Sequence, residues 1–260
     1  MKGRHIEQNT QDMDPKMTAM VIQANRDILV GVKLAHYMGH EWEPTEMAVE
    51  AGRMANVPVM IDFGGAQPPL GLDTLLLHKL RPGDIFTHCF GLLGSRIPIV
   101  DETTGKVRPY AWEAQKRGVI FDVGHGGGSF AWSQALPAIR EGFEPNSIST
   151  DLHTGSMNGA MKDQLNIMSK LLNTGLSLEK VVAKSTWAPA QYIQRPELGH
   201  LSPGSEADIA VLRLEEGRFG FIDTGGYTYK GNQRLQCELT LRKGAVVWDL
   251  NGISRPEWKE

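Results

Sequence analysis

The sequence has few of the features that mark membrane, extracellular or nucleic-acid-binding proteins. Among its 260 residues, no apolar run approaches the ~18 residues that a transmembrane helix needs. The polar first nine residues are not expected to form a signal peptide. Two widely separated cysteines, Cys89 and Cys237, favour reduced thiols in a cytoplasmic protein. A net charge of −3, from 27 basic and 30 acidic residues, argues against a general binder of nucleic acid or anionic membranes.

Internal repeats and low-complexity tracts are also missing, and His-x-His occurs nowhere in the chain. Apolar residues make up 41% of the sequence, which is enough for a large core. The length fits one α/β barrel or two smaller domains.

Strand-like and helical patterns alternate along most of the chain. Continuous apolar strands are typical of a parallel sheet that is buried on both faces, and short turns between units imply right-handed crossovers. We therefore predict an α/β fold. The expected strands are 27–33, 57–63, 84–90, 119–125 and 147–153, and the expected helices are 14–25, 43–56, 70–80, 109–117, 130–141 (interrupted at Pro137), 161–174 and 178–184. Residues 91–107 have no period and are expected to form a long loop over the site.

The composition changes near Gly199. Short β-like runs separated by Gly-rich turns follow, over residues 207–214, 218–222, 236–242 and 245–250. We expect a hydrolase-type α/β domain at 1–198 and a small β segment at 199–260.

A polar residue stands at or within two positions of the end of each predicted strand. These five residues are Lys33, Asp62, His88, His125 and Asp151. In an α/β barrel the C-terminal ends of all strands converge on one mouth, where the chemistry is placed. The stretch 147–153 is the centre of this prediction, because its carboxylate is followed closely by His153 and then by a turn rich in Gly, Ser and Asn.

This set of side chains suits a divalent metal. A single histidine at a strand end is more often structural, but five polar residues at equivalent positions are harder to explain in that way. Imidazoles and carboxylates suit Zn²⁺ or a similar ion. Lysine becomes a ligand when CO₂ adds to its neutral amine. A carboxylate beside a metal-bound water can take its proton and deliver it to a leaving amine. Gly126–Gly128 could instead cradle a phosphate, although a close approach of backbone to a ligand explains these glycines better.

The chain resembles the amidohydrolase superfamily, most closely its dihydroorotase-like deacetylases. The resemblance extends from about Asp14 over nearly the whole chain, and it rests on Gly31–Lys33, Thr87–Phe90, Phe121–Gly126, Ser149–His153 and the run from Thr186 to Ile209. It implies a (β/α)8 barrel and two bridged metal ions, with zinc expected. Lys33 would be the carboxylated fourth-strand lysine, His88 the sixth-strand metal ligand, and Asp151 the eighth-strand ligand and catalytic acid/base.

Two departures from the family pattern change the expectation. The fifth strand of such enzymes usually ends in a metal-binding histidine, and here the corresponding residue is Asp62. The family's first-strand His-x-His pair is absent, as are the first three βα units if Lys33 ends the fourth strand. We therefore predict a partial barrel of strands 4–8. The strands that end at Lys33 and Asp151 would be exposed edges, which would favour homo-oligomers or poor solubility.

The functional hypothesis is a metal-dependent deacetylase that hydrolyses a C–N bond in a small N-acyl substrate. Asp151 is the expected acid/base, the expected metal ligands are Lys33, His88, Asp151 and Asp62, and His125 and His153 are expected to contact substrate or to support the ligands. A cyclic amidase, a catalytically incomplete fragment and a phosphate-binding protein are the alternatives. A small molecule is the only partner expected besides a second copy of the chain.

Overall fold

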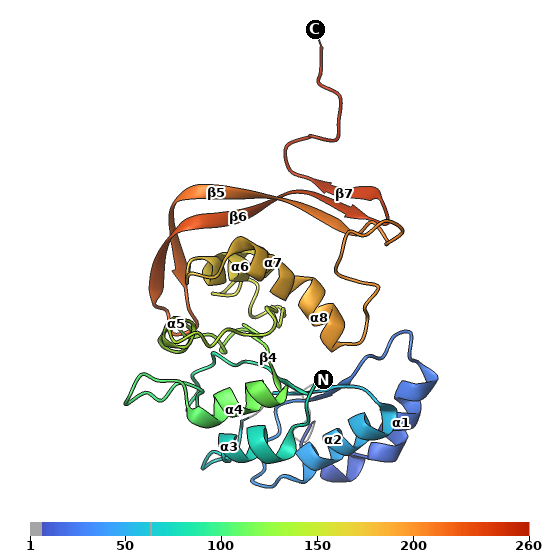
Figure 1. The fold of residues 1–260 in the computed structure, drawn as a ribbon, viewed down its shortest axis with the longest axis vertical. Coiled ribbons are helices and arrows are strands. Elements are labelled where there is room, and N and C mark those ends of the chain that lie inside the picture. Colours follow the sequence, from blue (N-terminus) through green and yellow to red (C-terminus); the bar gives the residue numbers. More distant parts are fainter. Residues whose placement is uncertain (1–6, 63, 260) are drawn as a thin grey trace.

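The computed structural model describes residues 7–62 and 64–259 (Figure 1). It contains a four-stranded parallel sheet in the order β1-β2-β3-β4 and a three-stranded antiparallel sheet. The parallel strands are β1 (Val32–Leu34), β2 (Val59–Ile61), β3 (Ile85–Phe86) and β4 (Ile120–Phe121). The register pairs Lys33 with Met60, and Ile85 with both Met60 and Ile120. The predicted α/β fold with successive parallel units is confirmed.

Helices follow the parallel strands as the sequence pattern predicts. They are α1 (Pro15–Ala24), α2 (Glu43–Ala55), α3 (Leu72–Thr74), α4 (Pro109–Arg117), α5 (Trp132–Arg140), α6 (Gln164–Leu172), α7 (Leu178–Ser185) and α8 (Trp187–Tyr192), with a 3₁₀ turn η1 (Thr10–Asp12) and a π-helical turn η2 (Leu75–Lys79). The carboxylate of Asp163 accepts a hydrogen bond from the backbone of Asn166 and caps α6. The cap explains why α6 begins three residues later than predicted. Helix α5 continues through Pro137 instead of breaking there.

The predicted strands are longer than those observed. Residues 25–28 form a turn in which the backbone N–H of Leu29 donates to the carbonyl of Asn25, so the first strand begins only at Val32. His88 has a φ of 62°, which turns the chain out of the extended conformation soon after β3. Phe63, the predicted last residue of the second strand, lies outside the described residues.

The fifth unit is a single parallel bridge with extended backbone beside it. Ser147 pairs with Asp122, and the backbone N–H of His125 donates to the carbonyl of Ser149. The prediction that this unit leaves an exposed edge is wrong. The backbone N–H of Ile148 donates to the carbonyl of Lys184 in α7, and Ile148 is buried. The last helices therefore cover this side, whereas β1 pairs with β2 alone among the described residues.

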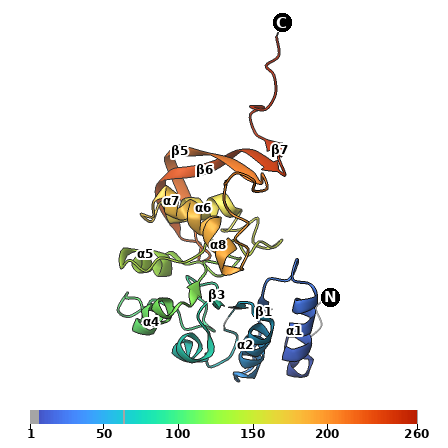
Figure 2. The same ribbon diagram turned by 45° about the vertical axis from the view of Figure 1, so that its right-hand side comes forward.

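The four predicted β runs form three strands, β5 (Ile209–Ile222), β6 (Thr228–Arg242) and β7 (Ala245–Asp249), of which the first two are longer than predicted. The β5–β6 hairpin arches over α6 and α7, and its tip reaches down to α5 (Figures 1 and 2). At the tip, the carboxylate of Asp223 accepts from the backbone of Trp132, whose indole N–H donates to the carbonyl of Phe221. Thr224 is hydrogen-bonded to the carbonyl of Phe130. The hairpin is thereby fixed to the α/β part.

One continuous core joins the two sheets. Phe121 packs edge-on against Phe86 and Phe143, and Phe221 and Leu235 of the hairpin belong to the same buried cluster. The division at residues 198 and 199 stays a prediction. Within the described residues, no helix has the length and apolar character to span a membrane.

Candidate active site

Asp62 and His88 face each other just beyond the C-terminal ends of β2 and β3. Oδ2 of Asp62 lies 3.4 Å from Nε2 of His88, and both side chains are almost fully buried. Arg96, from the long loop after β3, forms an ion pair with Oδ1 of the same carboxylate. His36 approaches Oδ2 at 3.4 Å from the solvent side.

The orientation of His88 is fixed by the neighbouring strand. Its Nδ1 donates to the carbonyl of Gly124, which directs Nε2 toward Asp62. Gly124 has a φ of 44°, and a Cβ there would overlap the hydroxyl of Thr87 and crowd the imidazole ring of His88. Only glycine therefore lets the β4 backbone approach the histidine this closely.

A buried carboxylate ties three strand ends together beneath the site. Asp122 accepts hydrogen bonds from the hydroxyls of Thr87 at 2.7 Å, Ser147 at 2.6 Å and Ser149 at 2.7 Å. These donors come from the residues that follow β3 and from the fifth unit. Asp122 therefore holds the segments that carry His88 and Asp151 in register.

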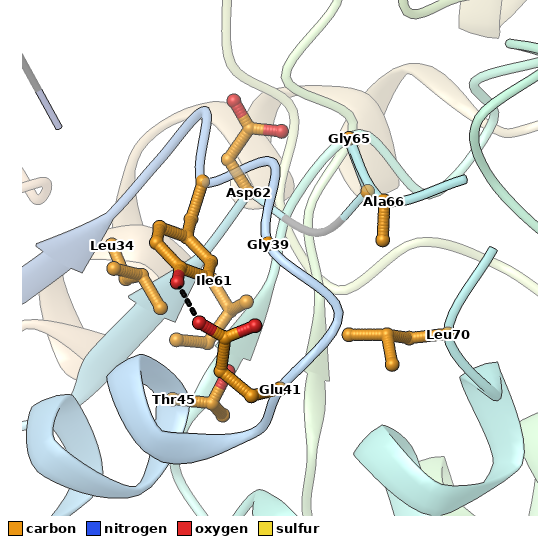
Figure 3. Close-up of a pocket in the computed structure, with 11 residues that line it drawn as sticks. Leu34, Gly39, Glu41, Thr45, Ile61, Asp62, Gly65, Ala66 and Leu70 are labelled. Atoms are coloured by element: carbon orange, nitrogen blue, oxygen red, sulfur yellow. Dashed lines mark hydrogen bonds between the residues drawn. The ribbon is translucent and has the colours of Figure 1, made fainter. Parts of the chain in front are cut away.

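Electrostatics keep Asp62 ionised. Burial alone would raise the pKa of its carboxyl group, but the hydrogen bond from His88 and the charges of Arg96, His88 and Lys33 together lower the pKa to about 2. Figure 3 shows Asp62 above a small pocket of about 30 Å³ at the ends of β1 and β2, lined by Leu34, Ile61 and Leu70 among others. A hydrogen bond between Tyr37 and Glu41 closes one side of it.

Asp151 follows the extended backbone of the fifth unit and is exposed. Its φ of 49° turns the chain away from the sheet, and its carboxylate lies directly over Gly126. A Cβ on Gly126 would stand 2.6 Å from Oδ2 of Asp151, and one on Gly127 would stand 3.4 Å from Nε2 of His153. The glycine run thus gives room to these two side chains.

His125 is completely buried rather than open to the mouth. Its ring stacks on Phe130 with the centroids 4.7 Å apart, its Nδ1 donates to the carbonyl of Gly126, and its Nε2 accepts from Nζ of Lys170 at 2.7 Å. Lys170 also donates to the carbonyls of Ala160 and Ile222. Burial lowers the pKa of Lys170 to about 7, and burial together with the charge of Lys170 lowers the pKa of His125 to about 4.

The chain has clear relatives. Residues 131–243 match the amidohydrolase family model. A deacetylase of Enterococcus faecalis is 33% identical over 191 residues, which cover 73% of this chain and 50% of that protein.

This chain belongs to the amidohydrolase superfamily.

Solved structures agree with that assignment. An adenine deaminase matches with a TM-score of 0.86 and 29% identity, over 93% of this chain and 66% of that one. A dihydroorotase matches with a TM-score of 0.82 and 30% identity, over 93% of this chain and 64% of that one. The fold of this chain is thus part of a TIM barrel with a small C-terminal sheet. The chain spans about half the length of the curated relatives it matches.

The structure brings together some of the predicted amidohydrolase residues and separates others. Asp62 and His88 are in contact, and Asp151 and His153 lie together over the glycine run. Lys33 is exposed on β1 and acts on Asp62 only through its charge. Arg96, Asp122 and Lys170 were not predicted. Asp122 could have been found as a lone carboxylate inside an apolar strand, whereas Arg96 stands in a loop without a period.

The carboxylate of Asp62 and the imidazole of His88 are donor types that divalent metals bind. Because Nδ1 of His88 donates to the carbonyl of Gly124, the atom that faces Asp62 is Nε2; when Nε2 gives up the proton that it shares with the carboxylate, its lone pair points at Asp62. Two lone-pair atoms facing each other need a proton or a cation between them. Among the residues that the structure describes, however, no group of three or more His, Cys, Asp or Glu side chains is placed to hold a metal. The described chain therefore presents the pair of Asp62 and His88, with His36 near the same carboxylate oxygen, rather than a closed site.

Proposed function

We propose that this chain belongs to a metal-dependent deacetylase that hydrolyses the C–N bond of a small N-acyl substrate. The observation that supports it best is the buried pair of Asp62 and His88 at the C-terminal strand ends, with Nδ1 of His88 anchored on a backbone carbonyl. A histidine that ligates a metal is usually oriented in this way. The deacetylase named among the relatives supports the substrate class.

Asp62 and His88 would hold the metal, with Asp151 and a carboxylated Lys33 completing the set; zinc is the proposed ion and two ions the proposed number. A bound metal would polarise the substrate carbonyl and lower the pKa of a bound water. Lys33 meets one condition for carboxylation, because its exposed amine is accessible to CO₂.

Asp151 is the proposed acid/base. Its exposed carboxylate stands at the mouth and lies over Gly126, where a small substrate can reach it. It would accept a proton from the attacking water and pass it to the leaving nitrogen. His153, next to it, is the proposed substrate contact. His125 would support the site without contacting the substrate, because both of its ring nitrogens are already hydrogen-bonded. Through Nδ1 it fixes the carbonyl of Gly126.

A cyclic amidase is the second candidate, and the similarity to a dihydroorotase favours it. The two reactions break the same kind of bond, since both release a nitrogen from a carbonyl carbon. They differ in the shape of the substrate, so a substrate panel separates them.

A catalytically incomplete chain is the third candidate, because the sequence contains no His-x-His pair.

We also propose a cytoplasmic location, which the two free thiols support.

The test is hydrolysis of N-acetyl amino acids and of dihydroorotate by the purified chain with Zn²⁺ added. We expect slow hydrolysis of an N-acetyl substrate, lost in Asp151→Asn and kept in Asp27→Asn, whose side chain is exposed on the turn before β1. Hydrolysis of dihydroorotate alone would favour the cyclic amidase. No turnover of either substrate, or full activity of Asp151→Asn, would contradict the proposal.

A further inference from the structure

The carboxylate of Asp62 already has a permanent cation beside it. Arg96 pairs with Oδ1, and its side chain is only 12% exposed. Water therefore screens its charge weakly. As long as it is not carboxylated, Lys33 adds a second positive charge nearby, whereas His88 and His36 approach the other oxygen. Within residues 7–62 and 64–259, these four side chains are the titratable or charged groups that face the carboxylate.

The position of Arg96 depends on a glycine. Gly64 has a φ of 109°, and a Cβ there would overlap Cγ of Arg96. The arginine side chain therefore lies across the backbone that immediately follows β2. Its Nε is buried and has no hydrogen-bond partner among the described residues, while the guanidinium contacts the carboxylate of Asp62.

We propose that Arg96 competes with a divalent metal for Asp62 and so sets the metal affinity of the site. This inference rests on the proposed function. The reason is electrostatic: a guanidinium on Oδ1 neutralises the charge that would attract a cation to Oδ2, and it repels a divalent ion placed between Oδ2 and Nε2 of His88. Arg96 is therefore a residue that determines metal affinity rather than a catalytic residue.

A supporting role for Arg96 would have the opposite effect. An arginine that merely orients a ligand carboxylate raises metal affinity, as partners of ligands usually do. Arg96→Gln distinguishes the two roles, because glutamine can still donate a hydrogen bond to Oδ1 but carries no charge.

The experiment is calorimetric titration of the full 260-residue chain with Zn²⁺ alone. We expect Arg96→Gln to bind Zn²⁺ at least about tenfold more tightly than the unchanged chain, a difference of about 1.4 kcal/mol. Arg108→Gln is the matched control, since Arg108 ends the same loop but pairs with Asp101. Its affinity should equal that of the unchanged chain.

Equal or weaker Zn²⁺ binding by Arg96→Gln would overturn the inference, and so would the absence of binding in both proteins. A second measurement uses the unchanged chain, in which Arg96 is still present. In NMR spectra of the unchanged chain, the Nε–H signal of Arg96, assigned with Arg96→Lys, should shift as Zn²⁺ is added. A signal that stays fixed at saturation would also overturn the inference. Hydrolysis does not enter either readout, so a failure of the proposed function is seen separately.

Discussion

Nε2 of His88 lies 3.4 Å from Oδ2 of Asp62, and neither side chain is more than 4% exposed. The pair connects two neighbouring strand ends, and the orientation of the imidazole is set by a carbonyl from a third. Most of the proposed chemistry depends on this contact.

Loss of the imidazole should therefore lower metal content. We expect His88→Ala to reduce the zinc-to-protein ratio measured by atomic emission, because Asp62 then faces no nitrogen donor. His78→Ala is the control, since His78 is exposed on η2. An unchanged ratio in His88→Ala would exclude His88 as a ligand.

Filling the space under Asp151 should impair function more than folding. In Gly126→Ala, the new Cβ would stand 2.6 Å from Oδ2 of Asp151 and displace the carboxylate. Gly105→Ala is the control. Its φ of 67° is also positive, like the 50° of Gly126, but a Cβ on Gly105 has no atom within 4 Å. We expect similar melting temperatures for both variants and a loss of hydrolysis only in Gly126→Ala. Equal activity would show that the position of Asp151 does not matter.

Asp122 should be important for stability. Asp122→Ala leaves three buried or half-buried hydroxyls without their acceptor, and we expect a loss of at least about 2 kcal/mol in the free energy of unfolding, measured in urea. The exposed carboxylate of Asp27 provides the comparison, because Asp27→Ala should change stability by no more than about 0.5 kcal/mol. Similar values for both variants would contradict the role given to the hydroxyl network.

The buried pair of His125 and Lys170 predicts how stability depends on pH. Folding lowers both pKa values, to about 4 from 6.5 for His125 and to about 7 from 10.5 for Lys170. The unfolded chain therefore binds more protons between each pair of values, and stability should fall as the pH falls from 10.5 to 7 and from 6.5 to 4. One group contributes a slope of at most about 1.4 kcal/mol per pH unit.

Lys170→Met tests this assignment. The variant should lose the slope above pH 7 and should weaken the slope below pH 6.5, because the charge of Lys170 is one cause of the low pKa of His125. Urea unfolding between pH 5 and pH 9 measures both. Parallel curves for the two proteins would assign the slopes to other groups.

The free side of β1 predicts self-association. Among the described residues β1 pairs only with β2, and α1 beside it exposes Met17, Met20 and Val21. Apolar surface next to an unpaired strand favours contacts between copies. Sedimentation velocity should show a concentration-dependent increase in sedimentation coefficient. A monomer over the whole concentration range would show that the edge is protected.

The alternation of apolar runs and helical patterns predicted the order of the units, because burial on both faces imposes a continuous run on each strand. Strand lengths were not predictable in the same way. His88 ends its unit with a positive φ, and its ring is bonded to the carbonyl of Gly124, a contact that the apolar pattern of the strand does not indicate.

The rule that chemistry lies at strand ends led to Asp62 and His88, which the structure places in contact. It could not find Lys170, because a lysine in a helical pattern predicts a solvated face, whereas here the side chain is fully buried among carbonyl oxygens. It placed His125 toward the mouth, since position along a strand does not indicate which neighbour will cover the ring. That neighbour is Phe130.

The hairpin tip also sets the order in which the chain can complete its fold. The contact of Phe130 with Thr224 joins residues 94 positions apart, and Lys170 connects His125 to Ile222 over 45 and 52 positions. During synthesis the loop that holds Gly126 is made long before the hairpin that secures it. Because distant contacts form late, this loop reaches its final conformation only after the tip of the hairpin has been made and has docked.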